Sequence, residues 1–238
     1  MNHGKGKTLH SPFQYFKMAL LGTVVLSCVY AINQIKLSQY FPIKTVRVYG
    51  INRINHDEIQ NLLLPLVNRG FFKVNVDYIR DRLQQLPWVS EIAVRRNWPD
   101  QVDITVIEKN PIARWNGQNL LSESGEVFIA TPDLSPTHLP IFNGPEGKQV
   151  MMLQYFNQLN QVLQPIHARI AVLEMTPYFT WKLTLDNGIA LQVGHKDILT
   201  RLSHFVKVYP KIVGNRAADV EYIDLRYSNG MAVRWKTT

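Results

Sequence analysis

The feature that most constrains this chain is an uncharged, mostly apolar segment close to its N-terminus. Residues 18–35 contain no charged side chain, and Lys5, Lys7 and Lys17 precede them. Because a helix rises about 1.5 Å per residue, a segment of this length can just cross the hydrocarbon core of a membrane. The preceding lysines favour a cytoplasmic N-terminus. We therefore predict a cytoplasmic tail over residues 1–17 and a membrane helix over residues 18–36.

Three other interpretations of this segment stay open. A cleaved signal peptide has the same basic start, but its apolar core is shorter and ends in small residues, whereas apolar residues here continue through Val29, Tyr30 and Ile32. A lipoprotein signal would use Cys28, although the bulky Leu26 fits such a site poorly. The third alternative is a buried helix of a soluble protein.

Composition argues against several classes of binding site. The net charge of +8 suits nucleic-acid binding, but the basic residues are spread thinly and form no stripe interleaved with aromatic side chains. We therefore expect no nucleic-acid partner. Cys28 is the sole cysteine, which excludes a disulfide within the chain and a structural zinc site built on several cysteines.

The sequence carries no recognisable active-site motif. The seven histidines include no pair at the i, i+4 spacing of a helical metal site, and there is no G-x-S-x-G motif. Asp219, Glu221 and Asp224 are clustered, as a hydrolase of cell-wall glycan would need. In a strand, however, Asp224 would lie on the opposite face from the other two. We expect a non-enzymatic protein with no catalytic residue, no cofactor and no metal.

The pattern after a linker over residues 37–42 predicts a small α+β module over residues 43–111. Apolar residues alternate from Ile43 to Ile51, as in a strand, and Asn55 begins a helix that Pro65 should end or kink. A second helix is expected over residues 75–86, and strands over 89–96 and 102–108. The predicted order is β-α-α-β-β, with two helices on one face of a three-stranded sheet.

Four sequence runs in and after this module carry a resemblance to a known family. They are LPWV at residues 86–89, VRRNWP at 94–99, VDITV at 102–106 and EKNPIARW at 108–115. Together they resemble the POTRA domain of the bacterial FtsQ/DivIB family of cell-division proteins, and the resemblance extends from residue 18 to residue 235. It implies a single-pass inner-membrane protein of the division septum, with the N-terminus in the cytoplasm and the remaining domains in the periplasm.

The remaining residues, 112–238, predict a second module. Three hairpins are indicated, around Ser124-Gly125, Asn187-Gly188 and Asn229-Gly230, and Asn-Gly between alternating apolar runs is a strong signal for a type I′ turn. Two helices are expected, over residues 148–163 and 197–208, with Asp197 as N-cap of the second. Residues 131–147, rich in Pro and Gly, should wind over the surface. We predict an antiparallel β domain backed by these two helices.

A protein without chemistry of its own must act through its surface, and the last hairpin is the best candidate. Its final strand should be a sheet edge with unpaired backbone groups, which a partner strand can pair with. The opposing interpretation is that Tyr227 and Trp235 only close the core. The family resemblance implies contacts with FtsB, which travels with FtsL. The residues implied are Arg226, Tyr227, Asn229, Gly230, Val233, Arg234 and Trp235, with Arg201 as a weaker candidate.

The resemblance also implies the wider role of such a chain. It would link early division proteins of the inner membrane, which dock on the POTRA domain, to the FtsB/FtsL complex, and so help control septal peptidoglycan synthesis. The alternative is a POTRA-containing component of an outer-membrane secretion or assembly system.

Overall fold

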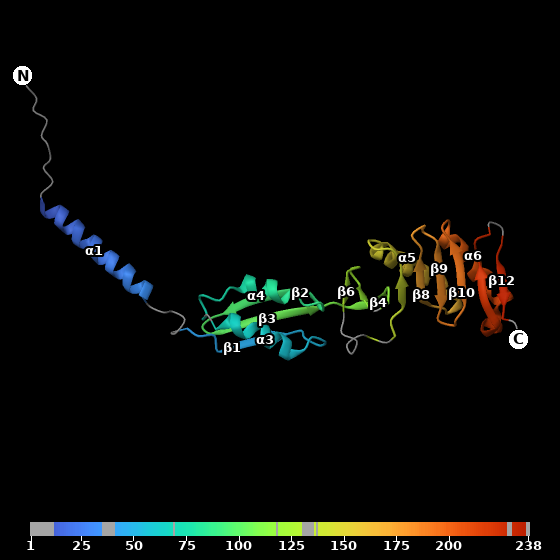
Figure 1. Ribbon diagram of the computed structural model, residues 1–238, viewed down its shortest axis with the longest axis horizontal. Helices are drawn as coiled ribbons and strands as arrows, with labels where there is room; N and C mark the ends of the chain where they lie inside the picture. The colour runs from blue at the N-terminus through green and yellow to red at the C-terminus, as the bar shows by residue number, and fades with distance from the viewer. Residues whose placement is uncertain are drawn as a thin grey trace, which may run out of the picture.

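The computed structural model describes residues 12–34, 41–68, 70–117, 119–129, 136, 138–227 and 230–236. Figure 1 shows an elongated arrangement in which helix α1 (Pro12–Gln34) is followed by an N-terminal module and then by a longer C-terminal module. The side chains described from Met18 to Tyr30 in α1 are exposed. Within the described residues, no helix combines the length and the apolar character that crossing a membrane requires. The membrane helix over residues 18–36 is therefore not confirmed.

The N-terminal module has the predicted β-α-α-β-β order. Its elements are β1 (Thr45–Tyr49), α3 (His56–Val67), α4 (Val76–Leu83), β2 (Val89–Asn97) and β3 (Gln101–Glu108). The sheet order is β1-β3-β2, in which β3 pairs parallel with β1 and antiparallel with β2. Asn55 begins α3, as predicted, and its side chain accepts a hydrogen bond from the Asp57 backbone. Pro65 does not end α3, which continues to Val67.

The core of this module forms between the central strand and the two helices. Val102, Ile104 and Val106 on β3 are at most 3% exposed. They pack in one cluster with Ile59 and Leu63 of α3 and with Ile79 and Leu83 of α4. The alternate residues of β3 point to a face that no helix covers, because successive strand side chains point to opposite sides.

The C-terminal module is built on a single nine-stranded sheet with the order β12-β11-β10-β9-β8-β7-β4-β5-β6. The strands are β4 (Pro111–Trp115), β5 (Asn119–Ser122), β6 (Val127–Ile129), β7 (Ile141–Asn143), β8 (Ile170–Met175), β9 (Trp181–Leu185), β10 (Ala190–Gly194), β11 (Val220–Asp224) and β12 (Ala232–Trp235). The helices are α5 (Gln149–Leu163) and α6 (Ile198–Ile212), with 3-10 turns η2 (Gln164–Ile166) and η3 (Gly214–Asp219).

The prediction of a purely antiparallel domain is wrong, because the sheet is mixed. The three predicted hairpins do pair antiparallel, but the β4–β7, β7–β8 and β10–β11 pairs are parallel. Parallel neighbours need a crossover connection, and α5 and α6 supply it for the β7–β8 and β10–β11 pairs. Strand β7 also lies in the segment that was expected to wind over the surface.

Both helices pack on one face of this sheet. Leu159 of α5 and Leu202 and Phe205 of α6 share one buried cluster with strand residues such as Leu183 and Leu191. Asp197 precedes α6, as predicted, but its side chain makes no capping hydrogen bond.

The two modules share part of one core. Leu120 and Phe128, on β5 and β6 of the C-terminal module, belong to the buried cluster of the N-terminal module. The Phe128 ring meets the Trp88 ring edge-to-face, with centroids 5.2 Å apart. Lys109 Nζ lies 2.7 Å from Glu126 Oε1 and 5.3 Å from the Phe128 ring centroid. This junction joins the modules through apolar packing and one largely buried lysine.

We predict that Phe128→Ala lowers the free energy of unfolding by about 3 kcal/mol, because it removes a buried aromatic ring and leaves a cavity beside Trp88. Urea unfolding of the full chain, followed by circular dichroism, measures this loss. The control is the neighbouring Ile129→Ala, whose side chain is exposed and whose loss should change stability by less than about 0.5 kcal/mol. Equal effects of the two substitutions would contradict the shared core.

Candidate functional site

Strand β12 is an edge of the nine-stranded sheet, as predicted. It pairs only with β11, antiparallel, with Ile223 opposite Val233 and Asp224 opposite Ala232. Beyond the strand, Lys236 N–H donates to the Asp219 carbonyl. Figure 1 shows β12 at the end of the molecule farthest from the N-terminal module. The backbone N–H and C=O groups on the outer side of β12 therefore have no neighbouring strand within the described part of the chain. A strand of another protein can form hydrogen bonds with them.

The two faces of β12 differ in character. Val233 and Trp235 are half-buried and pack against the core of the C-terminal module, whereas Ala232 and Arg234 are exposed. The Arg216 guanidinium lies over the Trp235 ring, 4.3 Å from its centroid. Trp235 therefore closes the core, and its remaining surface lies beside the free edge. The structure thus confirms that Trp235 closes the core, and its contact with a partner stays a prediction.

Arg226 is held in place by a buried carboxylate. Asp224, at the end of β11, accepts hydrogen bonds from Arg226 Nη2 at 2.6 Å, from Nε at 2.9 Å and from the Arg226 backbone N–H at 2.9 Å. The side-chain hydrogen bond from Arg226 lowers the pKa of Asp224, against the opposing effect of burial. The Arg226 side chain itself remains 57% exposed. Its guanidinium is thus oriented while it still faces solvent.

Arg201 comes from α6 and lies next to Arg226. Its Nη1 donates to the Val193 carbonyl at 2.9 Å. Between the two arginines lies Gly194, with φ +90°, where a Cβ would be 3.0 Å from Arg201 Nη1 and 3.3 Å from Arg226 Cγ. A side chain at this position would therefore crowd both arginines. The sequence contained no signal for Gly194, because its role depends on two residues brought together by folding.

A small pocket of about 50 Å³ completes the site. Arg201, Leu225, Tyr227, Gly230 and Met231 line it, together with His204 of α6. Tyr227 is 59% exposed, an unusual fraction for a tyrosine that only fills a core. Of the predicted contact residues, Asn229 lies outside the described residues. The other seven gather at the free end of the sheet, around the strand β12 and the start of its hairpin.

The clustered carboxylates are each paired with an arginine. Asp219 contacts Arg216 at 3.2 Å, Glu221 contacts Arg234 at 3.1 Å and Asp224 contacts Arg226 at 2.6 Å. In the part of the chain that the structure describes, no group of three His, Cys, Asp or Glu residues is placed to hold a metal ion. The arrangement combines a free strand edge, an exposed tyrosine and oriented arginines. Such a surface can bind an extended chain that carries carboxylates.

Comparisons with known proteins agree with this architecture. A family model described as "POTRA domain, FtsQ-type" matches residues 41–109, and one described as "Cell division protein FtsQ/DivIB, C-terminal" matches residues 113–226. The cell division protein FtsQ of Coxiella burnetii is 35% identical over 196 residues, which cover 82% of this chain and 81% of that protein. FtsQ of Escherichia coli is 33% identical over 227 residues, which cover 92% and 82% of the two chains.

The matches therefore span both modules, and they follow the same order along the chain as the two sheets. On this basis the chain belongs to the FtsQ/DivIB family of cell division proteins.

Proposed function

We propose that this cell-division protein acts by binding, and that its β12 edge takes up FtsB in complex with FtsL. The observation that carries the proposal is the unpaired edge of β12, next to which α6 and the segment after β11 bring together Arg201, Arg226 and Tyr227. A segment of FtsB would add to β12 as a further strand, so that backbone hydrogen bonds supply affinity. The arginines and Tyr227 would supply specificity, since these residue types dominate binding hot spots.

The N-terminal module has the complementary role in this proposal. It docks division proteins that arrive earlier, while the C-terminal module holds FtsB and FtsL. The packing of Phe128 against Trp88 at the junction supports this role, because a shared core fixes the orientation of the two modules relative to each other. The protein would thereby link early division proteins to the complex that helps control septal peptidoglycan synthesis. The FtsQ-type family matches favour this role over a part in outer-membrane secretion.

Location in the inner membrane is part of the same proposal. Its support is the row of exposed apolar side chains on α1, among them Leu21, Val25 and Val29, and the family to which the chain belongs. Fractionation of cells that express the tagged chain tests it, because recovery in the soluble fraction alone would contradict membrane attachment.

We predict that Tyr227→Glu weakens capture of the periplasmic segment of FtsB by about tenfold or more, because it places a charge where an exposed aromatic ring contacts the partner. A pull-down with the full chain, quantified by titration, measures this loss. Tyr178→Glu is the matched control, since Tyr178 is 87% exposed in the loop between β8 and β9. Unchanged capture by a folded Tyr227→Glu chain would contradict the site. Trp235→Ala is less decisive, because Trp235 also packs against the core.

The proposal also requires Asp224 to hold Arg226. We predict that Asp224→Asn weakens FtsB capture and lowers the free energy of unfolding at pH 7 by about 1–2 kcal/mol, through the loss of a charge-assisted hydrogen bond. Because the pKa of Asp224 is lowered by folding, its contribution is present above the ordinary carboxyl value of 3.8 and is lost as the pH falls through the lower folded value.

Urea unfolding of wild type and Asp224→Asn between pH 7 and pH 2 measures that dependence, and the difference between them should shrink toward zero in acid. Asp219→Asn is the control. Its side chain is 57% exposed and pairs with Arg216, which is 65% exposed, so its loss should cost less than about 0.5 kcal/mol. A difference that persists unchanged at the lowest pH would contradict the role of the ionised carboxylate.

A further inference from the structure

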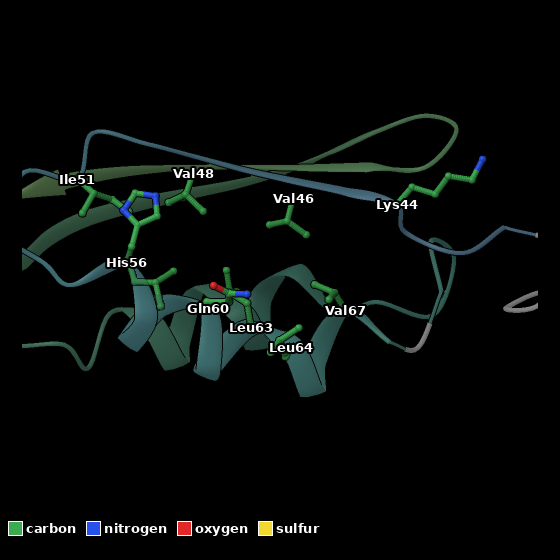
Figure 2. A pocket seen from close by; sticks show the side chains of 10 residues that line it. Lys44, Val46, Val48, Ile51, His56, Gln60, Leu63, Leu64 and Val67 are labelled. Carbon is green, nitrogen blue, oxygen red and sulfur yellow. The ribbon is translucent and has the colours of Figure 1, made fainter.

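A second open edge lies in the N-terminal module, far from β12. A groove of about 400 Å³ runs between β1 and α3. Figure 2 shows the side chains of Val46 and Val48 directed from the strand toward the helix, with Leu63, Leu64 and Val67 of α3 facing them. Among the described residues that line the groove there is no carboxylate. Seven of the ten lining residues are apolar, and Lys44, His56 and Gln60 supply the polar groups of the groove.

The groove exists because the core of this module is left open on one side. Strand β1 is the outer strand of the order β1-β3-β2, so its second edge has no neighbouring strand among the described residues. The core-facing residues of the central strand β3 are fully buried, whereas Val46 and Val48 of β1 are only half-buried and Leu64 of α3 is 50% exposed. One further strand beside β1 would cover these side chains and pair with its free backbone groups.

The face of β1 that points away from the groove indicates which charge a strand added beside β1 should carry. Arg47 points away from the groove, and the register places it beside Asp103 of β3, which in turn lies beside Arg95 of β2. The Asp103 carboxylate accepts hydrogen bonds from Asn97 and Gln101. Arg47 is exposed and forms no ion pair with any residue that the structure describes. The row thus alternates in sign and ends on an unpaired cation at the open edge.

A second copy of this chain fits the edge poorly. Antiparallel pairing of β1 with itself about its central residue would place Arg47 directly opposite Arg47, and like charges opposite each other destabilise a strand pair. An acidic residue at that place continues the alternation instead. Its neighbours in the added strand point to the other face, into the apolar groove.

We propose that the β1–α3 groove binds an extended segment of another protein with the pattern apolar–acidic–apolar, added as a fourth strand to the sheet. The acidic residue lies beside Arg47, and the two apolar residues fill the space between Val46, Val48 and Leu64. This site is independent of the β12 edge, because it uses the other module and a different sheet.

The test uses fluorescein-labelled, end-blocked peptides with the core Thr-Val-Glu-Val-Thr or Thr-Val-Lys-Val-Thr, titrated with the purified full chain and followed by anisotropy. The glutamate peptide should bind at least about fivefold more tightly than the lysine peptide, since opposite charges meet across the strand pair. Arg47→Glu should reverse this preference. Leu64→Glu should weaken both peptides, because it places a charge in the groove wall.

Arg95→Glu is the matched control, since Arg95 occupies the same row on the other edge strand and is also exposed. It should retain the preference of the wild type, and circular dichroism verifies that each variant is folded. The proposal is overturned if neither peptide binds at millimolar concentration, if the preference is insensitive to Arg47→Glu, or if it follows Arg95 instead. It is also overturned if sedimentation shows a dimer that Leu64→Glu dissociates, because a second copy would then be the occupant.

Discussion

The parallel pairing of β10 with β11 determines the geometry of the proposed partner site. After β10 the chain leaves the sheet, forms α6, and returns to place β11 parallel to β10. The next strand, β12, can then only add at the outside, where it becomes the edge. The same crossover carries Arg201 on α6 back over Gly194 to meet Arg226 after β11. The free edge and its cationic border are thus consequences of one connection.

The electrostatic arrangement at this edge favours an ordered surface over a reactive one. Each nearby carboxylate pairs with an arginine, and the most buried of them, Asp224, fixes the orientation of Arg226. Exposed ion pairs contribute little to stability, so Arg216–Asp219 and Arg234–Glu221 mainly shape the surface. The Asp224–Arg226 pair differs, because the carboxylate is buried and accepts several hydrogen bonds. This ion pair holds the exposed Arg226 guanidinium against the core of the sheet.

Two of the edge strands carry the proposed partner sites. One is β12 in the C-terminal module, and the other is β1 in the N-terminal module. Figure 1 places them toward opposite ends of the folded modules. Between them, Leu120, Phe128 and Trp88 form one packed cluster across the junction. In the arrangement that we propose, each edge binds one partner, and the shared core keeps the two edges in a defined relation.

Much of the local structure could be predicted from the sequence, because it depends on neighbouring residues. The hairpin at Asn187-Gly188 forms as expected, but its turn is not the expected type I′, because Gly188 has a positive φ of +86° and Asn187 does not. The β-α-α-β-β order follows from a period-two pattern that changes to a helical period and back. The position of β12 as the last strand also followed from chain order. These features rest on periodicity, caps and turn chemistry, which are written in consecutive residues.

Other features were decided only by tertiary structure. Strands β4, β7 and β8 were not predicted, since short segments such as Ile141–Asn143 become strands only when neighbours on both sides pair with them. The mixed direction of the sheet depends on where α5 and α6 return the chain. The proximity of Arg201 to Arg226, and of Phe128 to Trp88, joins residues distant in sequence. Sequence alone therefore determined the main helices, the hairpins and their order along the chain. Long-range packing, which no local pattern encodes, added the remaining strands and decided which edges stay open and what surrounds them.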